Sequence, residues 1–444
     1  MHPPVGMETG VTLFTPRIIG LQFNTLEAMQ TVANGSAAGE NAGAGVCRSA
    51  GRGSMRKQVA MLVVAAIAGL LTATANAQEK LKIGVIATFS GPPAVLGQQL
   101  RNGIQLALKD LGGKLAGREV ELIVQDDELK PDVAVSKVKA LIERDKVEFV
   151  VGPIFSNVLQ AIFKPVTEAD VILISPNAGT SNFAGKECNA NFFVTSYQND
   201  QAFGVAGKYA QDAGLKNIFL IAPNYQAGRD ALAGFKSFYK GQIVDEVYVP
   251  LGQPDYSAEL AKIASASPDA IYVFLPGGMG VNFVKQFRQA GLADKMVFLS
   301  AFTVDESTLP AQQDAAIGFF GGANWAPNLD NPQNRNFVAS YEKEFGAVPA
   351  TYAFQAYDAI LLIDGALKLT QGATTDKAAL RAALKKANFT SLRGDFKFNT
   401  NNYPIQDFYL VKVVKRADGK FQTEIEKKIF TNFADRHAQD CPMK

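Results

Sequence analysis

Short apolar runs alternate with longer amphipathic stretches along most of the chain after residue 80. The runs at 82–88, 149–151 and 171–174 are rich in β-branched and aromatic residues and show little polar alternation, which is typical of strands buried on both faces of a parallel sheet. The stretches between the runs carry apolar residues at helical spacing. This strand–helix alternation predicts right-handed βαβ units and a doubly wound α/β fold.

The strand–helix pattern restarts near residue 192 and continues through a second set of apolar runs. The fold class we predict is therefore α/β, with two doubly wound parallel-sheet lobes joined by a hinge. The hinge crossings are expected near 197–201, 320–327 and 398–404, where Gly, Asn or Pro are frequent, although ordinary loops share that composition. The predicted division is 78–198 and 325–400 for lobe 1, 199–324 and 401–430 for lobe 2, and 431–444 for a C-terminal tail.

The first 77 residues differ from the rest in composition. Residues 1–54 are rich in Gly and Ala without periodicity, and residues 55–77 combine a basic start, an apolar run over 59–71 and an A-x-A pattern, as in a secretory signal. A transmembrane anchor is the alternative, but the apolar run is short for one. We expect Met55 to be the true start, 1–54 to be a non-native or disordered extension, and the mature protein to be periplasmic from Gln78.

Charge and cysteine usage narrow the function classes. The portion from Gln78 onward carries as many basic as acidic residues, so nothing attracts it to nucleic acid or an anionic membrane. It keeps two cysteines, Cys188 and Cys441, which predict a disulfide in an oxidising compartment, with two free buried thiols as the alternative. His437 is its only histidine, which leaves almost no room for histidine-based catalysis. No metal site or cofactor is predicted.

Residues 149–180 read as a strand, a turn, a helix, a strand and a second polar turn. Both turns, at 152–157 and 175–180, leave the carboxyl ends of nearby parallel strands, where open α/β sheets bind ligands. Ser156 or Asn157 can cap the helix, whose free N–H groups favour an anion. The segment predicts a carboxylate-binding shelf, and the alternative is a structural cap with two ordinary turns.

Five segments together resemble a known family: KIGVIATFSGPPAVLGQQLRNGIQLAL, VVGPIFSNV, VILISPNAGT, PNYQAGRDAL and YDAILLIDGAL. They are similar, in order and spacing, to the branched-chain-amino-acid-type periplasmic binding proteins, which are type I solute receptors of ABC importers. The resemblance covers residues 80–414. It implies a monomer whose two lobes close like a Venus flytrap on a small carboxylate and deliver it to a membrane permease.

The resemblance also implies a set of site residues. In amino-acid-binding members, the Ser and backbone amides of the GPxxS turn, together with the SPxxT turn, hold the ligand carboxylate. An aromatic residue on the second lobe covers the ligand, and a residue of the first loop lines the pocket. The residues of this sequence that match the turns are Ser156, Asn177, Ala178, Gly179 and Thr180. Those expected to form the remaining walls are Leu96, Phe155, Tyr225, Pro276, Phe302 and Thr303.

One position departs from the pattern of amino-acid receptors. Those proteins place a carboxylate just after the strand that matches 296–300, where it pairs with the α-ammonium group, whereas the matching residue here is Phe302. Asp305 and Glu306 follow three and four residues later and are expected to be solvated. Because an unpaired buried ammonium is strongly disfavoured, the ligand is expected to be an aromatic acid of the benzoate or phenylpropanoid type. Should a shift of the loop bring Asp305 into the cleft, a branched-chain or other amino acid is the alternative.

Two other function classes are compatible with a chain of this kind. An enzyme is disfavoured because GGMG at 277–280 lacks dinucleotide-binding spacing, Ser156 has no activating His or Lys motif, and G-x-S-x-G is absent. A ligand-sensing receptor domain with the same fold is the remaining alternative. The predicted secretory signal and the lack of a predicted DNA-binding headpiece favour a free periplasmic receptor.

Overall fold

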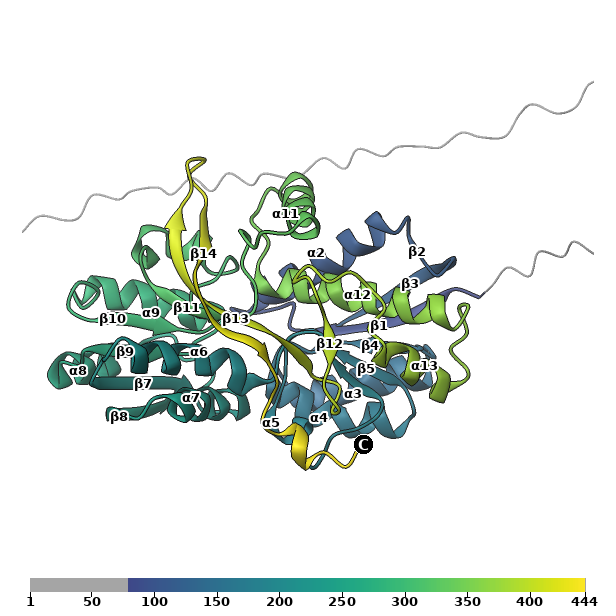
Figure 1. The fold of residues 1–444 in the computed structure, drawn as a ribbon, viewed down its shortest axis with the longest axis horizontal. Helices are drawn as coiled ribbons and strands as arrows, with labels where there is room; N and C mark the ends of the chain where they lie inside the picture. The colour runs from purple at the N-terminus through teal and green to yellow at the C-terminus, as the bar shows by residue number, and fades with distance from the viewer. Residues whose placement is uncertain (1–78, 444) are drawn as a thin grey trace, which may run out of the picture. The chain divides into compact units, whose positions relative to one another are not determined.

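The computed structural model describes residues 79–443. The expected extension over 1–54 and the expected signal over 55–77 lie outside this range. Within it, two predominantly parallel sheets are each flanked by helices, so the predicted bilobal α/β fold class is confirmed (Figure 1). A search of the same residues finds no helix with the length and apolarity needed to cross a membrane.

Lobe 1 contains a six-stranded sheet in the order β2-β3-β1-β4-β5-β6, in which only the β2–β3 pair is antiparallel. The strands are β1 (Leu81–Ala87), β2 (Lys114–Leu115), β3 (Arg118–Asp126), β4 (Phe149–Val151), β5 (Ile172–Ser175) and β6 (Phe192–Val194). The helices of this lobe are α2 (Ala94–Asp110), α3 (Pro131–Glu143), α4 (Ser156–Glu168), α5 (Ser181–Ala184), α11 (Pro332–Phe345), α12 (Thr351–Leu369) and α13 (Lys377–Lys385).

Lobe 2 contains an eight-stranded sheet in the order β12-β13-β11-β10-β9-β7-β8, with β14 paired to β13. Its strands β7 to β11 run parallel, and β12, β13 and β14 are antiparallel to their partners. The strands are β7 (Asn217–Pro223), β8 (Gln242–Val249), β9 (Ala270–Val273), β10 (Val297–Ser300), β11 (Phe320–Ala323), β12 (Lys397–Phe398), β13 (Pro404–Lys415) and β14 (Phe421–Phe433). The helices are α6 (Asn199–Asp212), α7 (Gln226–Phe238), α8 (Ser257–Ala266), α9 (Gly278–Gln289) and α10 (Leu309–Gln312), with short 3-10 turns at Gln313–Ala316 and Ala438–Asp440.

The pattern of the sequence explains the central strands. Every residue of β4 and β5 is buried, because helices cover both faces of a parallel sheet. Helix α12 is also buried over most of its length, where it packs against α2. Gly103 permits this approach, because a Cβ at that position would lie 2.1 Å from the carbonyl oxygen of Ala353. The start of α12 is thereby held against α2 within lobe 1.

Three segments connect the two sheets. The chain leaves β6 for α6 through residues 195–198, leaves β11 for α11 through 324–331, and passes from α13 to β12 through 386–396. All three lie within or beside the stretches whose composition suggested a hinge.

The carbonyl oxygen of Ser196 links these segments. It accepts hydrogen bonds from Asn324 Nδ2 at 3.0 Å, from Gln406 Nε2 at 2.7 Å and from Arg393 Nη1 at 3.1 Å. Arg393 is itself paired with the fully buried carboxylate of Asp358 at 3.0 Å. The first crossing is therefore tied to Asn324 in the second crossing, to Arg393 in the third and to Gln406 in β13.

The C-terminal tail is fastened to lobe 1. Strand β14 continues to Phe433, so the tail begins slightly later than the expected residue 431. Cys188, in the loop after α5, forms a disulfide with Cys441, with the two Cα atoms 5.6 Å apart. The predicted pairing of these cysteines is present.

Candidate ligand-binding site

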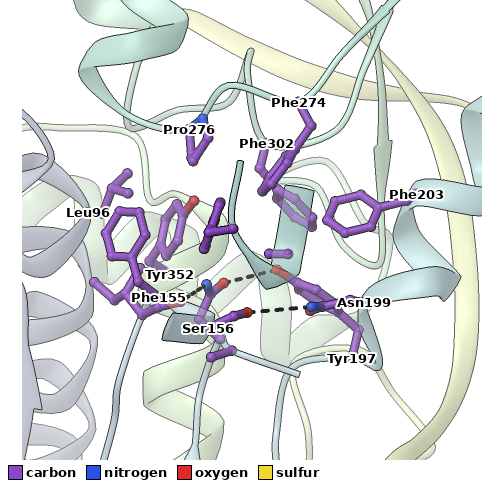
Figure 2. A pocket seen from close by; sticks show the side chains of 15 residues that line it. Leu96, Phe155, Ser156, Tyr197, Asn199, Phe203, Phe274, Pro276, Phe302 and Tyr352 are labelled. Carbon is purple, nitrogen blue, oxygen red and sulfur yellow. Dashed lines mark hydrogen bonds between the residues drawn. The ribbon is translucent and has the colours of Figure 1, made fainter. Parts of the chain in front are cut away.

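A pocket with a cavity volume of about 20 Å³ lies at the carboxyl ends of the parallel strands of both lobes. In lobe 1 it lies where the strand order reverses beside β1 and β4, and in lobe 2 where it reverses beside β7 and β9, the positions at which open α/β sheets bind ligands. Figure 2 shows the side chains converging on it from both lobes. The residues that line it are Leu96, Ile154, Phe155, Ser156, Asn177, Ala178, Tyr197, Asn199, Phe203, Tyr225, Ala227, Phe274, Pro276, Phe302 and Tyr352.

The turn before α4 brings the first of these residues into place. Gly152 has a φ of 134°, and a Cβ there would lie 1.9 Å from the carbonyl oxygen of Ile86, so the turn requires glycine. The close approach of this turn to the end of β1 carries Ile154 and Phe155 to the pocket.

Ser156 is the first residue of α4, and Phe155 occupies the N-cap position. No side chain caps the helix, so the prediction that Ser156 or Asn157 caps it is wrong. The hydroxyl of Ser156 instead lies 3.5 Å from Asn199 Nδ2, and the side chain is buried (Figure 2). Both the hydroxyl and the free N–H groups of the first turn of α4 are thus placed beside the pocket.

Asn177, in the second turn, connects the two turns to the first crossing. Its Nδ2 donates to the carbonyl oxygen of Ile154 at 2.8 Å, and its Oδ1 accepts from the hydroxyl of Tyr197 at 3.1 Å (Figure 2). Its backbone carbonyl accepts from the hydroxyl of Ser196 at 2.9 Å. These bonds fix the floor of the pocket.

Three residues predicted for the site do not line the pocket. The backbone N–H of Gly179 donates to Asn199 Oδ1 at 3.2 Å, and its carbonyl accepts from the backbone N–H of Asn199 at 2.7 Å. Thr303 Oγ1 donates to the carbonyl oxygen of Val273 and accepts from the N–H of Leu275, each at 2.9 Å. Thr180 is fully buried, and its hydroxyl has no hydrogen-bond partner among the described residues.

The structure brings the other eight predicted residues together and adds seven that sequence reasoning missed. Tyr197 and Asn199 follow the end of β6, in the stretch that the sequence marks only as a hinge. Phe274 directly follows the end of β9, two residues before Pro276. The ends of these two strands are therefore the signal that could have identified all three residues. Tyr352 is the second residue of α12 and lies five residues before the segment YDAILLIDGAL, but no residue type in that segment indicates a pocket. The residues missed are Ile154, Tyr197, Asn199, Phe203, Ala227, Phe274 and Tyr352.

Aromatic rings form one side of the pocket. Phe302 stacks on Tyr197 with ring centroids 4.9 Å apart, and its ring lies edge-on to Phe203 at 6.0 Å. Tyr225 lies nearly parallel to Phe274 with the centroids 6.3 Å apart. Phe302 adopts a φ of 56°, a left-handed conformation that is uncommon for an aromatic residue and that occurs preferentially at functional sites.

The pocket walls carry no formal charge. Among the described residues that line it there is no Asp, Glu, Lys, Arg or His. Burial raises the pKa of the hydroxyls of Tyr197 and Tyr352 well above the usual tyrosine value, so both remain protonated. Such a surface offers hydrogen-bond donors and aromatic faces, with no ionised partner for a cationic ligand.

Asp305 and Glu306 are buried, so the prediction that they are solvated is wrong. Asp305 Oδ1 accepts hydrogen bonds from the N–H and hydroxyl of Ser307, and Glu306 Oε1 accepts from the N–H and hydroxyl of Thr423 at 2.6 and 2.7 Å. Burial raises the pKa of Asp305 to about 6 and that of Glu306 to about 7. The loop after β10 turns both carboxylates into lobe 2, and neither lines the pocket.

Comparison with known proteins agrees with this geometry. Residues 80–420 match the periplasmic binding protein family. The chain is 29% identical over 377 residues to the Leu/Ile/Val-binding protein homolog 6 of Brucella melitensis, covering 82% of this chain and 95% of that protein.

Solved structures extend the comparison. A solute-binding protein of an ABC transporter from R. palustris, in complex with benzoate, is 31% identical with a TM-score of 0.78, covering 82% of this chain and 99% of that one. Another from Rhodopseudomonas palustris BisB5, in complex with 3,4-dihydroxybenzoic acid, is 33% identical with a TM-score of 0.76, covering 81% and 99%. A leucine-binding protein from Thermotoga maritima, 22% identical with a TM-score of 0.68, covers 78% and 97% and shares the fold. The chain therefore belongs to the periplasmic binding protein family, as an ABC-transporter solute-binding protein, and the resemblance found in the sequence is confirmed.

Proposed function

We propose that this protein is a periplasmic receptor that binds an aromatic carboxylic acid of the benzoate or phenylpropanoid type between its lobes and delivers it to an ABC-transporter permease. The observation that carries the proposal is Phe302, an aromatic ring stacked on Tyr197 at the position where the resemblance to amino-acid receptors calls for a carboxylate. The protein would act as a monomer, exported by the signal expected at 55–77.

The polar end of the pocket suits a carboxylate. Ser156 contributes a hydroxyl, and the first turn of α4 contributes N–H groups at the positive end of a helix dipole. Tyr197 and Asn177 are already hydrogen-bonded to each other, so they would brace this end of the pocket. An anion would therefore be stabilised by hydrogen bonds without a cationic side chain.

The opposite end of the pocket suits a ring. Phe203, Phe274 and Phe302 lie within one aromatic cluster, in which the centroids of Phe203 and Phe274 are 4.7 Å apart. Offset and edge-to-face contacts of this kind contribute about 0.5–1.5 kcal/mol per aromatic pair beyond burial of apolar area. An α-ammonium group placed there would have no ionised partner among the described lining residues, and its desolvation would oppose binding.

Related proteins support the same choice. Two of the relatives above 30% identity are complexes with benzoate and with 3,4-dihydroxybenzoic acid. The leucine-binding neighbour is below 25% identity and so bears only on the fold.

Binding of a branched-chain amino acid is the second candidate. It is favoured by one observation, the buried Asp305 Oδ2, which has no hydrogen-bond partner among the described residues and could pair with an ammonium group if the loop after β10 moved. The names of the curated Brucella relatives point in the same direction.

A thermal-shift and calorimetric screen distinguishes the two. The purified protein would be mixed with benzoate, 4-hydroxybenzoate, cinnamate, leucine and valine. A ligand present at 100 times its Kd stabilises the folded state by about 2.7 kcal/mol, which is readily detected. We expect stabilisation by one or more aromatic acids and none by leucine or valine, and the reverse result would overturn the proposal.

A further inference from the structure

We infer that Asp230, a residue of lobe 2 outside the pocket lining, is a positioning residue that orients the Asn199 amide so that the Ser156 hydroxyl donates to the ligand carboxylate. The inference rests on the proposed function only in assuming that the ligand carries a carboxylate at Ser156. It assigns to Asp230 and Asn199 a role that none of the motifs indicated.

Asp230 lies on α7 and is almost completely buried. Its Oδ2 accepts a hydrogen bond from Asn199 Nδ2 at 2.8 Å, and its Oδ1 accepts from the hydroxyl of Ser181 at 2.9 Å and from Gln226 Nε2 at 2.8 Å. Ser181 begins α5 in lobe 1, and its backbone N–H also points at Oδ2, at 3.3 Å. One carboxylate thus joins the two lobes beside the pocket.

Two contacts fix which way the Asn199 amide faces. A carboxylate can only accept hydrogen bonds, so the nitrogen of the amide must face Asp230. The backbone N–H of Gly179 can only donate, so the amide oxygen must face it, as the distance of 3.2 Å to Asn199 Oδ1 indicates. The hydrogen-bond network therefore determines the assignment of nitrogen and oxygen.

The remaining hydrogen of the Asn199 amide faces Ser156. The distance of 3.5 Å from Asn199 Nδ2 to Ser156 Oγ makes this a long hydrogen bond, with the serine oxygen as acceptor. A hydroxyl that accepts from a neighbour keeps its own hydrogen free to donate. Ser156 is thereby prepared to donate to an anion rather than to a protein group.

With the amide reversed, its oxygen would face Ser156, and the hydroxyl would donate to that oxygen instead of to the ligand. A ligand carboxylate, which only accepts, would lose a donor. A primary amide ligand, which can both donate and accept, would lose less. The orientation set by Asp230 therefore favours a carboxylate over the corresponding amide.

The surroundings of Asp230 include a second buried carboxylate, Asp200. Burial, and secondarily the charge of Asp200, raise the pKa of Asp230, although its hydrogen bonds from Asn199, Gln226 and Ser181 favour the ionised form. Asp200 is itself paired with Arg436 at 2.6 Å and His437 at 2.8 Å, both from the C-terminal tail. The tail thus supplies positive charge next to the second carboxylate.

The test is a double-mutant cycle measured by calorimetry with benzoate and benzamide. Asp230→Leu removes the acceptor at similar size, Asp230→Asn keeps an oxygen that can still accept from Asn199, and Asp245→Asn alters an exposed acid of the same lobe as a control. We expect Asp230→Leu to weaken benzoate binding about tenfold and benzamide binding by a smaller factor, and Asp230→Asn and the control to change both by less than about threefold.

The decisive comparison is with Ser156→Ala. If Asp230 acts through the serine hydroxyl, adding Asp230→Leu to Ser156→Ala should cause little further loss of benzoate affinity. Independent, additive losses would instead show a general structural role and overturn the inference. Should Asp230→Leu fail to fold, Asn199→Ala enters the same cycle with the same expectation.

Failure of the inference and failure of the proposed function give different results. If the unsubstituted protein binds no aromatic acid, the proposed ligand is wrong, and the cycle is run with whichever carboxylate does bind. If benzoate binds and the losses are additive, only the role of Asp230 is refuted.

Discussion

The ring of Tyr197, in the first crossing between the lobes, lies parallel to the ring of Phe302 in the loop after β10, with centroids 4.9 Å apart and an interplanar angle of 12°. Contact between these two rings depends on the approach of lobe 2 to the crossing. The pair therefore connects the aromatic wall of the pocket to the segment about which the lobes would open. A ligand ring that packs against Phe302 would therefore act, through the Phe302–Tyr197 contact, on the segment that connects the lobes.

Substitution of Phe302 tests what this wall selects. Phe302→Leu should weaken binding of an aromatic acid by about 0.5–1.5 kcal/mol, because it removes the ring contacts but keeps an apolar side chain. Phe302→Glu should abolish that binding, since it places a carboxylate near the ligand ring, and should create measurable binding of leucine by pairing with its ammonium group. Calorimetry with benzoate and leucine measures both effects.

Both outcomes can be contradicted. Unchanged benzoate affinity in Phe302→Leu would remove the ring from the site. If the Phe302→Glu variant keeps its thermal stability but binds no leucine, position 302 does not correspond to the carboxylate that pairs with the ammonium group in amino-acid receptors.

Ser156→Ala should reduce the affinity for a carboxylate by about 1.5–3 kcal/mol, the range for a hydrogen bond to a charged group. The serine is buried at the start of α4 and caps nothing, so the substitution should leave the melting temperature of the ligand-free protein nearly unchanged. Ser257→Ala, at the exposed start of α8, is the matched control. An affinity equal to that of the unsubstituted protein would place the anion elsewhere.

Glu306 should make stability depend on pH. Its pKa in the folded state is raised from 4.5 to about 7, chiefly by burial and then by the charge of Asp305. The folded protein therefore holds a proton that the unfolded chain releases, and stability should fall as pH rises from about 4.5 to 7 and then level off. The total loss attributable to this group is at most about 3 kcal/mol.

Glu306→Gln should remove this part of the pH dependence and stabilise the protein above pH 7, because a neutral amide oxygen can still accept from Thr423. Urea denaturation at a series of pH values measures the free energy of unfolding. Glu426→Gln, an exposed position on the same strand as Thr423, should leave the profile unchanged. A Glu306→Gln profile parallel to that of the unsubstituted protein would show that the carboxyl group does not titrate in this range.

Removal of the disulfide should destabilise the fold. Cys188 and Cys441 are separated by 253 residues, and replacing both with Ser should lower the free energy of unfolding by about 2–5 kcal/mol. Dithiothreitol should lower the stability of the unsubstituted protein to a similar extent and leave that of the double variant unchanged. Equal stability of the oxidised and reduced protein would contradict the expectation.

Structural features that depend on residues close together in the sequence were predictable. The buried strands follow from continuous apolar runs, and the turns after β4 and β5 follow from Gly, Pro and Ser at strand ends, so Ser156 and Asn177 could be placed beside a pocket. Phe302 was identified by comparing one loop with a family pattern.

Features that depend on distant partners were not predictable. Glu306 is buried because Thr423 on β14, more than a hundred residues away, donates to it twice, and nothing near position 306 indicates that strand. Tyr352 reaches the pocket only because α12 packs against α2. The prediction that Ser156 or Asn157 caps α4 was wrong because capping preference is a local property, whereas the turn at Gly152 places Phe155 at the N-cap position.

The bond between Cys188 and Cys441 has a topological consequence. All three segments that connect the lobes, at 195–198, 324–331 and 386–396, lie between these two cysteines in the sequence. They therefore belong to a single closed loop of covalent bonds, and cutting the backbone in any one of them leaves the two halves of the molecule in one piece under non-reducing conditions. Movement of the lobes can bend this loop, but a single proteolytic cut between Cys188 and Cys441 cannot release a separate fragment while the disulfide is intact.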